Sequence, residues 1–254
     1  MAKVTRLGDF SGQVEAYARA RPGYPIALVD RLCERAGLEP GDRIAEVGAG
    51  TGLFTEQLVN HRGLRVIAIE PSAAMRERAP KLAGVEWREG SFEACPIDDG
   101  EVPWVVAAQA FHWADPPRAL PELRRILAVG GRLSVLWNDR DLERSALLRH
   151  THALIDATVP DFDEGYRHRD WAAVLTSTGE FEAVEHDEVR HQVGMSHERY
   201  LDLWRSHNKL NWACREHGLD GFLAALREHL HAHEPDPVNV PYRCRAWTAT
   251  RRLG

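Results

Sequence analysis

The stretch Glu46-Val47-Gly48-Ala49-Gly50-Thr51-Gly52 decides how this chain is interpreted. It follows an apolar run at residues 43–47, typical of a buried strand, and precedes a helical pattern at residues 53–60. Glycines between a strand and a helix form a tight turn whose backbone amides can approach a ligand closely. Such a run is a weak signal alone, because a purely structural turn has the same composition. A ligand-binding loop therefore needs support from other parts of the sequence.

An acidic residue at the end of the next predicted strand gives that support. Glu70 closes the run Val66-Ile67-Ala68-Ile69-Glu70, and a carboxylate there can accept hydrogen bonds from both hydroxyls of a ribose. The dinucleotide fingerprint would need a glycine at position 53, where this chain has Leu53. The loop and Glu70 thus favour a nucleoside cofactor without a pyrophosphate, and a dehydrogenase stays a distant alternative.

Short apolar runs alternate with helical patterns through the first half of the chain. Strands are predicted at residues 43–47, 64–69, 85–89, 104–108 and 133–137, and helices follow Ser72 and Asp115 as first-turn signals. This alternation indicates an α/β fold with a parallel sheet and crossover helices. After residue 138 the pattern loosens into helical stretches, a weak strand at 184–193 and a final alternating strand at 242–250.

Composition limits the class of protein and its partners. The chain has 254 residues, of which 44% are hydrophobic and 28% charged, enough for one domain with an elaboration. A net charge of −6 argues against nucleic acid as a partner. The longest apolar runs are too short for a membrane span, and the N-terminus lacks a signal-peptide pattern, so we expect a cytoplasmic protein. Four cysteines without a Cys-x-x-Cys pair are expected to be thiols.

Further motifs follow in order along the chain. Residues 44–54 resemble motif I of the class I methyltransferases, which use S-adenosylmethionine (SAM), and Glu70-Pro71-Ser72 resembles the acidic segment after it. Gly90-Ser91-Phe92-Glu93 is similar to the segment that borders adenine in this family. The stretches 109–113 and 124–131 match the end of its fourth strand and the helix leading to its fifth. SAM carries no pyrophosphate, which agrees with Leu53, and the ordered set is far more specific than any one motif.

The resemblance implies a fold and a division of the chain. The expected fold is a Rossmann-like seven-stranded sheet, mostly parallel with the last strand antiparallel, with helices on both faces and a helical cap. A single domain, 1–254, would then comprise a cofactor-covering segment at 1–39 and a SAM-binding core at 40–138. A cap with strand six would follow at 139–235, and the final strand at 236–254.

The resemblance also implies the residues that contact the cofactor. Residues 17–25 look like the N-terminal segment of small-molecule methyltransferases of the trans-aconitate and natural-product type, in which this segment folds over SAM. Arg21 would pair with the carboxylate of the methionine end. The implied cofactor-binding set is Tyr17, Arg21, Glu46, Gly48, Ala49, Gly50, Gly52, Glu70, Pro71, Met75, Ser91, Phe92, Gln109 and Phe111.

Two residues are candidates for activating or orienting the methyl acceptor. His112 follows strand four at the edge where ligands bind in open α/β sheets, so we consider it as a general base. The alternative is a histidine that donates or accepts a hydrogen bond and moves no proton. Asn138, at the end of strand five, would orient a polar substrate or simply cap the strand. Aromatic and polar residues of the second half suit an acceptor pocket or ordinary helix packing: Tyr166, His168, Trp171, Trp204, His207, Asn208 and Trp212.

The leading functional hypothesis is methyl transfer from SAM to a small-molecule acceptor by a monomer or homodimer, without nucleic acid, membrane or metal. A second hypothesis keeps SAM but changes the reaction, such as a cyclisation that releases methylthioadenosine, and a third is a silent binding module.

Two motifs in the sequence are not taken as functional sites. Asp115-Pro116-Pro117-Arg118 lacks the aromatic residue of the nucleic-acid amino methyltransferases and is expected to start a helix. The three histidines between 229 and 233 are expected at a solvated helix end rather than on a metal.

Overall fold

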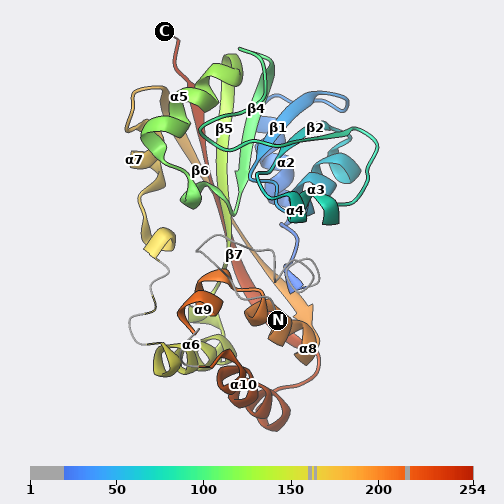
Figure 1. Cartoon of the computed structure of the whole chain (residues 1–254), viewed down its shortest axis with the longest axis vertical. Coiled ribbons are helices and arrows are strands. Elements are labelled where there is room, and N and C mark those ends of the chain that lie inside the picture. The colour runs from blue at the N-terminus through green and yellow to red at the C-terminus, as the bar shows by residue number, and fades with distance from the viewer. Residues whose placement is uncertain (1–19, 160–161, 163–164, 215–217, 254) are drawn as a thin grey trace. The chain divides into compact units, whose positions relative to one another are not determined.

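The computed structural model of the chain describes residues 20–159, 162, 165–214 and 218–253, with only the backbone of Asn208 (Figure 1). The chain forms two compact units. We call Gly23–Asn138, Tyr166–Val189 and Cys244–Gly254 the sheet unit, and Met1–Pro22, Asp139–Gly165 and Arg190–Arg243 the helical unit. One boundary falls directly after Asn138. Residues 166–189, which we expected in the cap, lie in the sheet unit.

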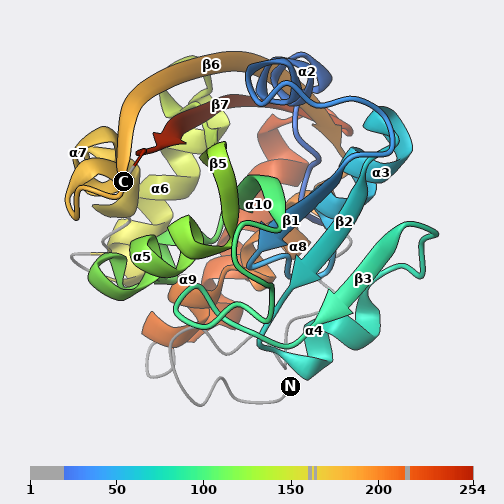
Figure 2. The ribbon, with the colours of Figure 1, turned by 90° about the horizontal axis from the view of Figure 1, so that it is seen from above.

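Within the described residues a seven-stranded sheet has the order β3-β2-β1-β4-β5-β7-β6 (Figure 2). The strands are β1 Arg43–Val47, β2 Arg65–Ile69, β3 Val85–Arg88, β4 Val102–Ala108, β5 Leu127–Arg140, β6 Phe181–Met195 and β7 Val238–Arg251. Strands β1 to β5 pair in parallel. β7 runs antiparallel to β5, since Arg132 bonds Thr250 while Ser134 bonds Thr248. The predicted Rossmann-like sheet is confirmed.

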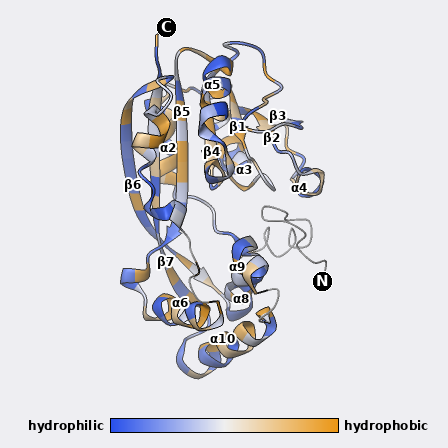
Figure 3. Ribbon diagram, turned by 60° about the vertical axis from the view of Figure 1, so that its left-hand side comes forward, coloured by the Kyte–Doolittle hydropathy of each residue, from blue (hydrophilic) through white to orange (hydrophobic). Residues whose placement is uncertain are grey.

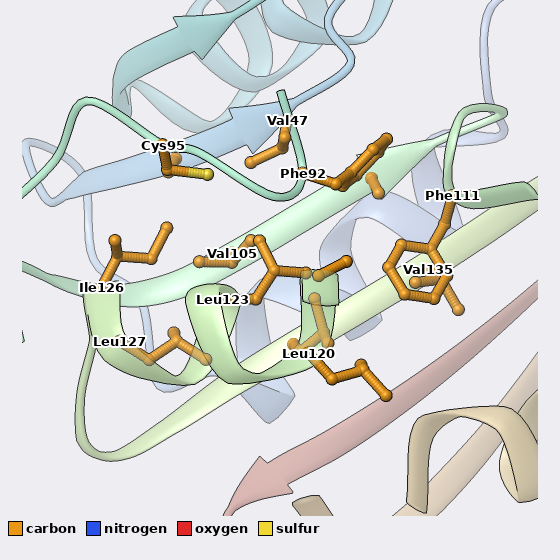
Figure 4. Close-up of a cluster of buried hydrophobic side chains, with 14 of the residues drawn as sticks. Val47, Phe92, Cys95, Val105, Phe111, Leu120, Leu123, Ile126, Leu127 and Val135 are labelled. Atoms are coloured by element: carbon orange, nitrogen blue, oxygen red, sulfur yellow. The ribbon is translucent and has the colours of Figure 1, made fainter. Parts of the chain in front are cut away.

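Alternation along the strands places helices on both faces of the sheet unit. Ala45 and Val47 point to a core shared with α5 (Pro116–Ile126) and α7 (Trp171–Thr176), shown in part in Figure 4. Ile44 points to the opposite core, shared with α2 (Ile26–Arg35) and α3 (Leu53–Arg62). Because successive side chains of a strand face opposite sides, the apolar run of β1 is buried on both.

Short local signals set where the connecting helices begin and end. The Ser72 hydroxyl accepts a hydrogen bond from the Met75 amide and starts α4 (Ala73–Arg78), as predicted. α4 ends at Arg78, because Pro80 holds Ala79 in an extended conformation. Asp115 precedes Pro116 at the start of α5, which confirms the second helix signal.

The helical unit has its own core. Its helices are α6 (Ala146–Thr158), α8 (His197–Arg205), α9 (Asn208–Ala213) and α10 (Leu219–His233), with the short 3-10 turn η2 (Leu142–Arg144). Both apolar and polar residues occur along α6 and α10 (Figure 3). The apolar ones, including Leu148, Ile155 and Leu226, pack with the fully buried Tyr200 and Trp204. The sequence predicts helical stretches in this half of the chain, with apolar residues at helical spacing in α8 and α10.

Histidines of the helical unit predict sensitivity to acid. The imidazole of His229 on α10 stacks on His150 of α6, with ring centroids 3.6 Å apart. Burial, followed by the neighbouring His150 and His233, lowers the pKa of His229, although Glu234 opposes this, and burial also lowers the pKa of His191. At these two histidines the unfolded chain therefore binds protons more readily than the folded one. Stability is fully present above the ordinary histidine pKa and is lost as pH falls below it.

We therefore expect these two histidines to reduce stability as the pH falls from 7.5 to 5.5, a contribution that has to be measured with variants because the raised pKa of the buried Glu46 acts in the opposite direction. Melting temperatures from circular dichroism in one salt concentration should show that His229→Gln loses less stability over this range than the unmodified protein, because the variant removes one of the groups that must stay neutral. His231→Gln, at an exposed position of the same helix, should lose as much as the unmodified protein. Equal losses in the two variants would contradict this assignment.

Candidate cofactor and acceptor site

The glycine loop joins β1 to α3 in the sheet unit. Gly48, Gly50 and Gly52 have φ angles of 75°, 58° and 81°, in the left-handed region that glycine enters without steric cost. The amides of Gly48 and Ala49 both donate to the Ile69 carbonyl of β2, at 2.8 and 3.0 Å. The turn therefore needs its glycines for backbone conformation, and β2 holds its first half.

Packing around the loop differs from glycine to glycine. A Cβ atom on Gly48 would lie 2.5 Å from the Ala110 Cβ, and one on Gly52 would lie 3.0 Å from the Trp87 ring. No atom of the described residues lies within 4 Å of the corresponding position on Gly50. The two ends of the loop are thus clamped by side chains, while the space over Gly50 is open in the part of the chain that is described.

Glu70, directly after β2, ties the centre of the loop to the next turn. Its Oε2 accepts from the Gly50 amide and its Oε1 from the Ser72 amide, each at 2.9 Å. The side chain is buried, and burial raises its pKa while the two amides and Arg76 oppose the shift. Because each carboxylate oxygen can accept a second hydrogen bond, Glu70 keeps acceptor capacity beside the open loop.

Glu46 lies on β1, the strand that precedes the loop, and its carboxyl differs from that of Glu70 in its protonation. It is fully buried, and its Oε2 accepts from the Thr55 hydroxyl of α3 at 2.5 Å. Burial raises its pKa to about 8, with the nearby Glu70 adding to the shift. At neutral pH the carboxyl of Glu46 is therefore mostly protonated, whereas a ligand cation nearby would favour its charged form.

Residues after β2 and β3 form one side of the loop's surroundings. Phe92 is buried, and its ring lies 3.2 Å from the position of a Cβ on Gly48. Ser91 sits in a turn in which its hydroxyl accepts from the Glu93 amide at 3.3 Å. Met75 is buried on α4, and Pro71 is exposed. Of these, Phe92 is the side chain that packs against the glycine loop.

Hydrogen bonds link the residues that follow β4 to the end of β5. Gln109, with an unusual φ of 55°, donates from Nε2 to the Asn138 carbonyl at 3.1 Å. Asn138 in turn donates from Nδ2 to the Gly23 carbonyl at 3.2 Å. Phe111 is fully buried, with its ring edge-on to Phe92 at 5.4 Å between centroids (Figure 4). Its side chain therefore supports Phe92 from the core rather than facing solvent.

His112 belongs to the 3-10 turn η1 (Phe111–Trp113) and is surrounded by aromatic rings. It stacks on Tyr166 of η3 (Gly165–His168), with centroids 4.3 Å apart and ring planes 15° from parallel. Its Nδ1 accepts from the indole Nε1 of Trp137 at 3.4 Å. Trp137 was not singled out from the sequence, although it directly precedes Asn138 at the same strand end.

Two expected cofactor contacts are not placed with this site. Tyr17 lies outside the described residues, and Arg21 belongs to the helical unit.

In the described part of the chain, no helix is long and apolar enough to cross a membrane, and no cluster of three or more metal-ligating side chains occurs. The four cysteines are buried thiols.

Comparison with known proteins identifies the family. Residues 45–135 match the family model described as a methyltransferase domain. An uncharacterized methyltransferase of Mycobacterium tuberculosis is 38% identical over 183 residues, which cover 66% of this chain and 72% of that protein. An uncharacterized methyltransferase-like protein of Schizosaccharomyces pombe is 35% identical over 56% of each chain.

Solved structures share the fold. A protein assigned provisionally as a type II methyltransferase, from Anaeromyxobacter dehalogenans, has a TM-score of 0.65 at 21% identity and covers 90% of this chain and 97% of its own. The phosphoethanolamine N-methyltransferase 2 of Haemonchus contortus, solved with SAM, has a TM-score of 0.55 at 15% identity and covers 96% of this chain and 57% of its own. Sheet order, glycine loop and sequence relatives agree, and the chain belongs to the class I SAM-dependent methyltransferases.

Proposed function

We propose that the sheet unit binds SAM over the glycine loop and that the chain transfers its methyl group to a small-molecule acceptor. The observation that carries this proposal is the open space over Gly50 beside Glu70. A ribose with two hydroxyls fits a buried carboxylate that has acceptor capacity left. The backbone of Gly50 leaves room for close approach because it has no Cβ.

Bound SAM would supply a methyl group already activated by its sulfonium, so the protein mainly has to position an acceptor. In this proposal Glu70 holds the ribose, and Phe92 closes one side of the loop. Asn138 acts as a positioning residue, because its bonds to Gln109 and Gly23 tie the ends of β4 and β5 to the start of the sheet unit. His112 faces the acceptor as a hydrogen-bonding group or as a base.

The test combines binding with product analysis. Titration calorimetry should show one SAM bound per chain. Incubation with SAM and a panel of small metabolites, followed by mass spectrometry, should yield S-adenosylhomocysteine. Methylthioadenosine instead would support a reaction in which SAM donates another group. Absence of SAM binding by folded protein would overturn the proposal and support a silent binding module.

A further inference from the structure

A tight turn between β3 and β4 carries Phe92 to the glycine loop. Ser91 and Ala94 each donate an amide hydrogen bond to the other's carbonyl, at 3.1 and 3.3 Å. Phe92 lies between them and packs against Gly48. Cys95 follows directly, and the side chains of Phe92 and Cys95 both belong to the core shared with α5 (Figure 4). The position of the Phe92 ring therefore depends on how this turn is fixed.

Glu122 and Arg125, three positions apart on α5, hold the end of the turn. The Glu122 Oε1 accepts from the Cys95 amide at 2.7 Å, and the Arg125 Nη2 donates to the Cys95 carbonyl at 3.0 Å. The Arg125 Nη1 also donates to the Ile97 carbonyl at 2.9 Å and to the Asp99 carboxylate at 2.6 Å. One pair of side chains thus binds both backbone groups of Cys95.

The guanidinium of Arg125 uses every donor it has. Its Nε and Nη2 donate to the Glu122 carboxylate, each at 2.8 Å, so its five N–H groups make five hydrogen bonds to described residues. The bonds from Arg125 hold the pKa of the Glu122 carboxyl below its usual range, although burial opposes this, and the Cys95 amide lowers it further. A lysine ammonium has three donors on a flexible stem and cannot reproduce this planar fork.

The start and the tip of the turn are fixed by other contacts. A Cβ atom on Gly90 would lie 2.7 Å from Pro96 and 2.9 Å from Ile69 of β2, so the chain is closely packed there. The Glu93 Oε1 accepts from the Asp115 amide, before α5, at 2.9 Å. A change in the charged pair on α5 would therefore release the end of the turn while its start stays packed, and the aromatic ring lies between the two.

We propose that Glu122 and Arg125 are positioning residues of the cofactor site, which fix the Phe92 ring against Gly48 and so set the affinity for SAM. This inference rests on the proposed function and deepens it, since neither residue was among the expected cofactor contacts. A small displacement of the ring matters, because a gap of about 0.5–1 Å already loses a quarter to a half of the van der Waals attraction between two atoms.

The position of the ring can be measured without SAM. In protein labelled with 4-fluorophenylalanine, the ¹⁹F resonance that disappears in Phe92→Leu belongs to Phe92. Arg125→Lys should shift or broaden this resonance. Arg124→Lys is the matched control and should leave it unchanged, because Arg124 pairs with Glu180 at 3.0 Å. An unchanged Phe92 resonance in Arg125→Lys would overturn the positioning role.

A double-mutant cycle then shows whether the pair acts on SAM through Phe92. In calorimetric titrations, Phe92→Leu and Arg125→Lys should each raise the dissociation constant for SAM roughly tenfold, the upper range for one aromatic contact. The double variant should stay within about twofold of Phe92→Leu, because it has no ring left to position. Independent effects would instead multiply to roughly 100-fold. Arg124→Lys should bind SAM like the unmodified protein.

The remaining outcomes separate this inference from the proposed function. Losses that multiply in the double variant would overturn the inference, because the pair would then affect SAM by another route. An unmodified protein that does not bind SAM would overturn the proposed function and the effect on affinity, while the ¹⁹F comparison still decides whether the pair positions Phe92. Thermal melts check that each variant is folded. Glu122→Gln, which weakens the pair but keeps an acceptor for the Cys95 amide, replaces Arg125→Lys in both measurements if the lysine variant does not fold.

Discussion

We expect the replacement of Gly50 with valine to weaken SAM binding strongly while the protein stays folded. The valine side chain would project into the open space over the loop, which is where the cofactor's close approach is proposed. Calorimetry should show a dissociation constant raised at least roughly 100-fold, equivalent to about 2.8 kcal/mol of lost binding free energy. The loss comes from excluded volume, because no described side chain or backbone atom is within 4 Å to be displaced.

Backbone strain has to be separated from this effect. Gly50 has a φ of 58°, where a β-branched residue is disfavoured, so the variant also loses about 1–2 kcal/mol of stability. Gly130→Val is the matched control. Gly130 has a φ of 74° and equally open surroundings in the described part of the chain, but it lies in β5 between the paired residues Leu127 and Arg132, near the amino end of the strand and away from the carboxyl ends where the loop lies. The control should melt earlier and bind SAM normally. Unchanged SAM affinity in folded Gly50→Val would refute the loop assignment.

Much of the sheet unit was accessible from the sequence because its signals are local. The apolar run before Gly48, the acidic residue after the next run and the Ser72 cap all act within a few residues of the chain. Parallel strands place their carboxyl ends on one edge, so motifs far apart in sequence were expected together. Two hydrogen bonds agree with that expectation: the Gly50 amide donates to Glu70, and the Gln109 side-chain amide donates to the Asn138 carbonyl.

The rest depends on tertiary contacts that local patterns do not encode. β5 continues through Asn138 to Arg140, and β6 begins at Phe181, because long pairing with β7 extends both strands beyond their apolar runs. Residues 166–189 belong to the sheet unit, although the sequence up to residue 180 looks helical and irregular and only a weak strand was predicted at 184–193. The orientation of His112 also needed the structure. Its partners Trp137 and Tyr166 are 25 and 54 positions away along the chain.

Replacing Glu70 with alanine should weaken SAM binding by a comparable amount through lost acceptors. The carboxylate accepts from the Gly50 and Ser72 amides and has capacity left for ribose hydroxyls. Alanine removes all of these and leaves two amides without their partner, so the loop loses its tie to β2 as well as its ligand contact. Each hydrogen bond to a charged group contributes about 1.5–3 kcal/mol, so we expect the dissociation constant to rise roughly 100-fold or more.

Glutamine at the same position separates the two roles of Glu70. The glutamine carbonyl oxygen can still accept a hydrogen bond from one of the two backbone amides. The glutamine nitrogen is a donor, so it cannot accept from the amide or ribose hydroxyl that donated to the second carboxylate oxygen of Glu70. We therefore expect a loss of roughly tenfold, the value of one good hydrogen bond, with stability nearer to the unmodified protein than in Glu70→Ala. Glu89→Gln, an exposed carboxylate that pairs with Arg76 nearby, should bind SAM normally in the same calorimetric titration. If Glu70→Gln and Glu70→Ala bind SAM as tightly as Glu89→Gln, Glu70 braces the loop without touching the cofactor, and the ribose contact is wrong.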